Sequence, residues 1–177
     1  MILNILVRIL QMRLMSDTSE FLTYIHGCIV KKFMEPVQPT MFYVEKNADI
    51  STVFSVVGKK HHAWVVDNKK NLQVIGIITE SDTLPLFASP YVPLQSFDKP
   101  PLQSFHYGLS PTAEEIMSTK PVTVFPDETM ARVIETMRQQ KIKQVAVVDK
   151  QGTLLGEVTL SRLIQEFAQR KKLVRSQ

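Results

Sequence analysis

The chain repeats one pattern of apolar residues after an interval of 80 positions. Residues 50–57 and 130–137 carry apolar side chains at helical spacing, and each run leads into an apolar strand that ends in an aspartate, Asp67 or Asp149. A second strand of similar composition follows in both copies. This recurrence predicts two copies of one helix–strand–turn–strand unit, packed as a pair. A ligand site can then lie between the copies.

Apolar spacing and capping residues predict the elements around each copy. We expect helices over residues 21–34, 50–57 and 129–139, with Gly58 closing the second of them. Residues 67–71 predict a hairpin turn in the first copy, because they are polar and join two apolar strands.

Six of the ten prolines lie between Pro85 and Pro111, which predicts a linker between the copies. The pentapeptide at residues 93–97 recurs at 101–105. It could be a docking motif, but a local duplication in an ordered crossover is the favoured interpretation.

A single cysteine in 177 residues excludes an internal disulfide and a multi-cysteine zinc site. This fits a reducing compartment, so we expect a cytoplasmic protein. The net charge is +4, and the excess is concentrated in residues 170–175. Such a tail can contact nucleic acid or acidic lipid. A solvated helix end is favoured, because cations complement the helix dipole and no aromatic platform accompanies the tail.

The first fifteen residues are mostly apolar but contain Arg8 and Arg13, and they are too short to span a bilayer. Three interpretations stay open: a helix that packs on a dimer or partner groove, a helix on a membrane surface, or an extension upstream of a start at Met15. Asn4, Arg8 and Gln11 share one narrow helical side, which favours the packing helix.

Hydroxyl groups stand where the second strand of each copy passes into a helix. They belong to the sets Thr79, Ser81, Asp82 and Thr159, Ser161, Arg162. Backbone N–H groups at a helix start, together with hydroxyls, favour an anion such as phosphate, and a carboxylate favours the hydroxyls of a ribose. The same residue types also serve as plain helix caps. Their recurrence after Gly76 and Gly156 favours binding.

These motifs resemble those of the cystathionine-β-synthase (CBS) domain family. The second copy carries the resemblance in the order Met-x-x-x-Pro-Val-Thr-Val-x-Pro-Asp-Glu-Thr-Met over residues 117–130, and in residues 147–149, 152, 155–156 and 158–159. The first copy matches more loosely at residues 33–36, 65–67 and 76–82. A tandem pair of this kind is called a Bateman module.

The resemblance implies an α/β (α+β) fold in which two β-α-β-β-α repeats pack about a pseudo-twofold axis, preceded by an N-terminal helical extension. The expected divisions are an extension over residues 1–28, repeats over 29–88 and 113–172, a proline-rich linker over 89–112 and a basic tail over 173–177.

The resemblance also implies a cleft between the repeats that binds AMP, ATP or S-adenosylmethionine, with no cofactor. The first site would contain Thr79, Ser81, Asp82, Ser118, Lys120, Val122, Ile142 and Lys143. In it Asp82 would hold the ribose, and the hydroxyls and lysines would lie near phosphate. The second site would contain Phe42, His62, Thr159, Ser161 and Arg162. Because Arg162 replaces the ribose-binding aspartate, we expect this site to be empty, degenerate or adapted to a more anionic ligand; a surface salt bridge of Arg162 is the alternative.

Catalysis is not expected, since the chain has no Walker-type phosphate loop and no nucleophile elbow. No metal site is expected either, because His61 and His62 are adjacent at a strand entrance and point to opposite sides. The predicted function is a regulatory module, dimeric with a second copy, that senses an adenosyl compound and signals to an enzyme, a transporter or a transcription factor. The alternatives are an interaction scaffold without a ligand and nucleic-acid binding through the tail; a membrane partner is not expected.

Overall fold

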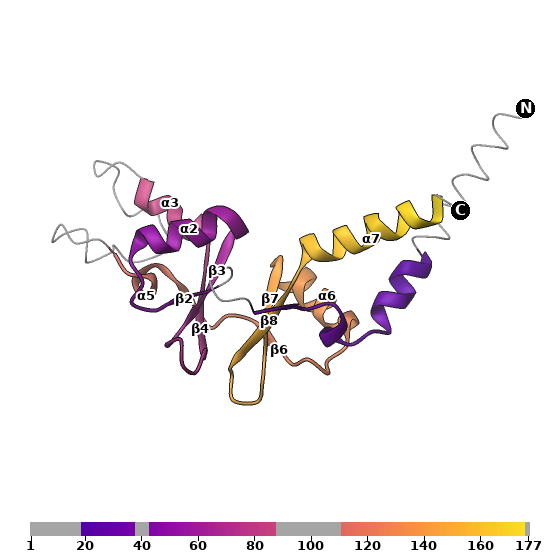
Figure 1. Cartoon of the computed structure of the whole chain (residues 1–177), viewed down its shortest axis with the longest axis horizontal. Coiled ribbons are helices and arrows are strands. Elements are labelled where there is room, and N and C mark those ends of the chain that lie inside the picture. Colours follow the sequence, from indigo (N-terminus) through magenta and orange to yellow (C-terminus); the bar gives the residue numbers. More distant parts are fainter. Residues whose placement is uncertain (1–18, 38–42, 88–110, 176–177) are drawn as a thin grey trace, which may run out of the picture. The chain divides into compact units, whose positions relative to one another are not determined.

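The computed structural model describes residues 19–37, 43–87 and 111–175, with side chains through residue 169. Phe42, the N-terminal fifteen residues, the duplicated pentapeptides and the side chains of the basic tail lie outside this part. The elements are a helical segment over residues 19–26, η1 (Val30–Lys32), β1 (Glu35–Pro36), β2 (Tyr43–Glu45), α2 (Ile50–Lys60), β3 (His62–Val66), β4 (Val74–Thr79), α3 (Glu80–Phe87), α5 (Ala113–Ile116), β5 (Ser118–Thr119), β6 (Thr123–Val124), α6 (Met130–Gln140), β7 (Gln144–Val148), β8 (Leu154–Thr159) and α7 (Leu160–Arg175) (Figure 1).

The predicted mixed α/β fold is confirmed: the described residues form two four-stranded sheets in the orders β1-β8-β7-β6 and β2-β3-β4-β5. The chain forms two compact units, and neither is continuous in sequence. The first contains residues up to 35 together with 124–147 and those from 157 onward; the second contains residues 36–123 and 148–156. The opening segment of the second repeat, with α5 and β5, therefore belongs to the same unit as β2, β3 and β4.

The core of the second unit lies between the sheet and helices α2 and α5. Strand β3 is central: it pairs in parallel with β2 and antiparallel with β4. Val53, Val56 and Val57 of α2 are buried together with Ala63 and Val65 of β3. The three valines recur at intervals of three and four residues and so share one face of the helix. The alternate residues of β3 are buried as well, so the strand is enclosed on both faces.

Helix α2 begins at the expected capping residue but ends later than predicted. The Asp49 carboxylate accepts a hydrogen bond from the Thr52 N–H at 2.8 Å, as an N-cap does. The prediction that Gly58 closes the helix is wrong, because α2 continues to Lys60 and His61 takes the left-handed position at φ 65°. Lys141 takes the matching position after α6 at φ 55°.

The helix predicted over residues 21–34 is wrong in its second half. The helical segment ends at residue 26, and Ile29 forms an isolated antiparallel bridge with Thr129. The Val30 N–H donates to the Glu128 carbonyl at 2.9 Å. These bonds to the start of α6 satisfy backbone groups that a continued helix would have paired within itself.

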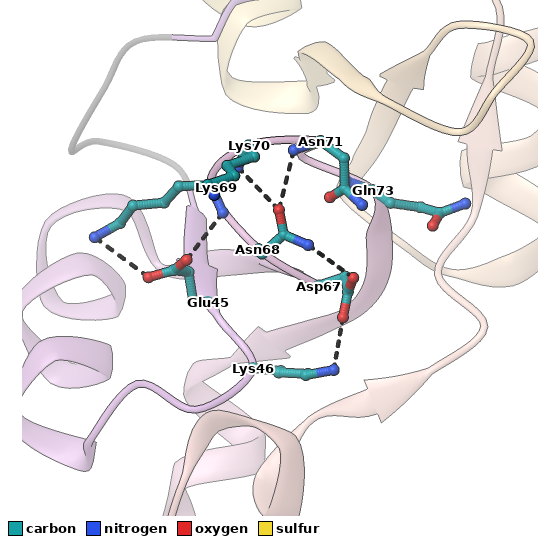
Figure 2. A network of polar contacts seen from close by, with 8 residues as sticks. All are labelled: Glu45, Lys46, Asp67, Asn68, Lys69, Lys70, Asn71 and Gln73. Atoms are coloured by element: carbon teal, nitrogen blue, oxygen red, sulfur yellow. Dashed lines mark hydrogen bonds and ion pairs between the residues drawn. The ribbon is translucent and has the colours of Figure 1, made fainter.

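Side chains of the turn itself and of the neighbouring residues Glu45 and Lys46 hold the turn between β3 and β4 (Figure 2). The Asn68 Oδ1 atom accepts from the N–H groups of Lys70 and Asn71 at 2.9 and 3.1 Å. The Lys46 Nζ atom lies 2.6 Å from Asp67 Oδ1, and this hydrogen bond lowers the pKa of Asp67 and raises that of Lys46. The predicted turn is therefore confirmed, and polar side-chain contacts stabilise it.

The tip of this turn pairs with the turn of the β7–β8 hairpin inside the second unit. The Val74 N–H donates to the Gly152 carbonyl at 3.1 Å, and the Leu154 N–H donates to the Leu72 carbonyl at 2.9 Å. If each residue is exchanged for its match 80 positions away, either bond becomes the other. Leu72 and Gly152 are matched residues, and both have positive φ, at 50° and 84°.

Two glycine-to-alanine substitutions are expected to change stability in opposite directions. Gly58 lies inside α2, and a Cβ atom added there would meet nothing within 4 Å, so Gly58→Ala should raise the free energy of unfolding by about 0.5–1 kcal/mol. Gly152 also has room for a Cβ, but its φ of 84° disfavours any L side chain. Gly152→Ala should therefore lower the free energy of unfolding by about 1 kcal/mol. Urea unfolding of both variants tests this, and changes of the same sign would contradict it.

Candidate functional site

The predicted site residues of the first repeat form a capped helix start. Asp82 Oδ2 accepts hydrogen bonds from the backbone N–H and the hydroxyl of Thr79, both at 2.8 Å. Thr79 immediately precedes α3, and Asp82 is the third residue of that helix, which is the spacing of a capping box. The carboxylate therefore has a structural role as well as a candidate binding role.

Ser118 reaches the same carboxylate from another strand. Its hydroxyl donates to Asp82 Oδ1 at 3.0 Å, across 36 positions of sequence. Strand β5 holds it there by pairing with β4, where Ile77 is opposite Ser118 and Gly76 is opposite Thr119. The structure thus brings together three of the predicted residues in one unit: Thr79, Asp82 and Ser118.

Gly76 allows this close approach of the chain. A Cβ atom at position 76 would lie only 2.3 Å from the Met117 sulfur and 2.9 Å from Met117 Cγ. Any larger residue would therefore displace Met117, which directly precedes Ser118. The glycine that the sequence places before the motif in the first repeat has a packing function that also positions Ser118.

The other five predicted residues of the first site differ in exposure and in the compact unit to which they belong. Ser81 and Lys120 are exposed, and Val122 is half-buried. Lys120 has a φ of 59°, so the chain turns directly after β5. The last two predicted residues, Ile142 and Lys143, belong to the other compact unit.

The second predicted set has a different chemistry at its helix start. The Arg162 N–H donates to the Thr159 hydroxyl at 3.1 Å, so Thr159 caps α7. The Arg162 Nη2 atom lies 2.7 Å from Glu166 Oε1, one helical turn later. The Arg162 guanidinium therefore forms a salt bridge, which the sequence analysis gave as the alternative to a role in ligand binding. Ser161 is exposed, and His62 is 4% exposed.

Glu157 is a buried acidic residue that the sequence interpretation did not select. It is 1% exposed on β8, on the same face as Thr159 because the two are two positions apart. Its match in the first repeat is Ile77, which is apolar. This exchange of an apolar residue for a charged one between matched strands was the signal that could have identified it.

The adjacent histidines lie in different environments. The His61 Nδ1 atom is 2.9 Å from Glu80 Oε1, with both side chains mostly exposed, whereas His62 is buried and forms a T-shaped ring contact with Trp64. Within residues 19–37, 43–87 and 111–169 there is no cluster of three or more histidine, cysteine or acidic side chains that could hold a metal ion. No helix in the described part of the chain is long and apolar enough to cross a membrane.

Comparison with known proteins identifies relatives of both repeats. A family model described as "CBS domain" matches residues 30–88 and 113–169. "Protein SDS24" of Saccharomyces cerevisiae is 24% identical over 136 residues, which cover 72% of this chain; the matched part spans only 25% of that relative.

Solved structures of other proteins share the fold. The crystal structure of CBSX2 in complex with AMP has a TM-score of 0.64 at 23% identity and covers 82% of this chain and 99% of that one. The CBS domain pair of protein MJ0100, solved with 5′-methylthioadenosine and S-adenosyl-L-methionine, has a TM-score of 0.57 at 22% identity and covers 81% of this chain and 98% of that one.

Proposed function

The chain belongs to the CBS domain family, and we propose that it is a regulatory module that binds an adenosine-containing compound at the start of α3. The observation that carries the proposal is the Asp82 carboxylate, which Thr79 and Ser118 hold at the N-terminus of α3. A fixed carboxylate beside hydroxyls suits a neutral sugar with an anionic group nearby.

Different groups of the proposed site suit the sugar and the phosphate of the ligand. The carboxylate can accept hydrogen bonds from the two hydroxyls of a ribose, since each of its oxygens has two lone-pair positions. The N-terminus of α3 favours the negative charge of a phosphate. Lys120 is exposed directly after β5 and can approach the same group. We propose that Ser81 and Val122 border the ligand.

The solved relatives support this ligand class. CBSX2 binds AMP, and the MJ0100 pair binds 5′-methylthioadenosine and S-adenosyl-L-methionine, all of which contain adenosine. At Arg162 the acceptor for a diol is absent, and the guanidinium is paired with Glu166. The set around Thr159 is therefore the weaker candidate for an adenosine ligand.

We propose that ligand binding changes the surface of the module that a partner protein contacts. A ligand that binds one arrangement of the module better than another shifts the population toward that arrangement, by no more than its difference in affinity. We propose that the module acts as a homodimer in the cytoplasm and that its partner is an enzyme, a transporter or a transcription factor. The side chains of the described site suit binding rather than bond cleavage.

Titration with AMP, ATP and S-adenosylmethionine tests the proposed function. At least one of them should bind the wild type and raise its melting temperature. Asp82→Asn should weaken that binding by about tenfold, because a hydrogen bond to a charged acceptor contributes about 1.5 kcal/mol or more. Calorimetry measures the affinity, and thermal unfolding measures the shift.

Asp49→Asn is the matched control, because it makes the same change at the start of α2, where asparagine caps equally well. This control should bind like the wild type. Binding of none of the three compounds would favour the scaffold alternative, and equal affinity of the wild type and Asp82→Asn would remove Asp82 from the site.

A further inference from the structure

The hydrogen-bonding capacity of the Asp82 carboxylate is largely used by the protein itself. A carboxylate has about four acceptor positions on its two oxygens. The Thr79 N–H and hydroxyl take two of them on Oδ2, each at 2.8 Å. The Ser118 hydroxyl takes a third on Oδ1 at 3.0 Å. At most one position is left for a further donor.

A ribose diol brings two adjacent donors to a carboxylate. With at least three positions occupied, both hydroxyls can bind only if one of the existing donors leaves. The ligand then exchanges one protein hydrogen bond for one of its own, and such an exchange adds little to affinity. A sugar with a single hydroxyl brings only one donor to the carboxylate, so its binding depends less on the departure of an existing donor.

The three donors differ in how readily they can leave. Thr79 is three residues from Asp82 and lies at the start of α3. If its hydrogen bonds to Asp82 broke, the Thr79 N–H would lose its acceptor at the helix start. Ser118 instead belongs to β5, which is two residues long and pairs with β4 at only two positions. The chain leaves this pairing at Lys120, where φ is 59°. Ser118 is therefore the donor that is most easily displaced.

We infer that the Ser118 hydroxyl is an internal competitor of the ligand at Asp82. The Ser118–Asp82 hydrogen bond and complete binding of a ribose diol exclude one another. This inference rests on the proposed function but assigns Ser118 a role opposite to direct ligand contact. It also gives the site a route of communication, because displacement of Ser118 releases the side chain that joins β5 to α3.

The test is calorimetric titration of wild type and Ser118→Ala with AMP and with 2′-deoxy-AMP. Removal of the competitor should tighten AMP binding about fivefold, the factor that corresponds to a net hydrogen bond of about 1 kcal/mol. The affinity for 2′-deoxy-AMP should stay within about twofold of the wild type. Thr119→Ala is the matched control, since Thr119 is the exposed neighbour in β5, and it should bind both nucleotides like the wild type.

Each result either supports or overturns the inference. Unchanged or weaker AMP binding by Ser118→Ala, with measurable binding by the wild type, overturns this inference alone and makes Ser118 a spectator or a ligand contact. An equal gain for both nucleotides also overturns it, because general loosening of β5 would then explain the gain. Binding of AMP by neither protein overturns the inference, and if ATP and S-adenosylmethionine also fail to bind, the proposed function fails with it. If AMP binds to Ser118→Ala but not to the wild type, Ser118 competes strongly with the ligand, and the inference is supported. Urea unfolding followed through Trp64 fluorescence shows that each variant is folded.

Discussion

Replacement of Trp64 by alanine should lower the free energy of unfolding by about 3–5 kcal/mol, the usual loss for a large buried aromatic side chain. Trp64 is 1% exposed and is the largest of the fully buried side chains in the described part of the chain. It lies in the middle of β3, opposite Ile77 of β4, and contacts the His62 ring edge-on at a centroid distance of 5.6 Å. A cavity at this position cannot be filled by small shifts, because β3 has paired strands on both sides.

Urea unfolding followed by far-ultraviolet circular dichroism measures this loss, since the substitution removes the only tryptophan. Trp64→Phe is the matched control: it keeps most of the apolar area and should lose less than half as much stability. A loss below about 1 kcal/mol for Trp64→Ala would show that the side chain is not buried in solution.

Gly76→Ala is expected to lower the free energy of unfolding by about 1–3 kcal/mol, as overpacking of an interior does. The added Cβ would meet Met117 at three atoms, with distances of 2.3 Å to the sulfur, 2.9 Å to Cγ and 3.1 Å to Cβ. Rotation of the Met117 side chain moves the first two atoms but not its Cβ. The remaining contact should push β5 away from β4 and lengthen the Ser118–Asp82 hydrogen bond.

A double-mutant cycle with Met117→Ala measures the contact directly. Met117→Ala removes the two nearest atoms, so the double variant should be more stable than the sum of the two single losses predicts. Strictly additive losses would show that Gly76 and Met117 do not contact each other. Gly58→Ala provides the control for a glycine substitution without a neighbour.

Much of the local structure followed from the sequence because local patterns encode it. The apolar spacing predicted α6 within one residue, and the polar run after Asp67 predicted the turn that Asn68 and Lys46 stabilise. The end of α2 was misplaced because glycine is the usual residue in the left-handed position after a helix. Gly58 does not have a positive φ here; the helix continues to Lys60, and His61 takes the left-handed position with its N–H donating to the Val57 carbonyl at 2.7 Å.

The candidate site shows where spacing alone stops being informative. Thr79 and Asp82 are three residues apart, so a helix start is enough to bring them together. Ser118 is 36 residues from Asp82, and it was the family resemblance that placed it in the same set. Glu157 was missed because a charged residue in an apolar strand is unexpected until its burial is known.

The sequence by itself determined that there are two matched copies and the order of helices and strands in each, because periodicity and capping act over a few residues. Only the tertiary structure decided which sheet each segment joins: β5 of the second copy pairs with β4 of the first, and β1 joins β8. Strand pairing is a nonlocal choice, set by which side chains fit together. Here the fit of Met117 over Gly76 places β5, and with it the hydroxyl that reaches Asp82.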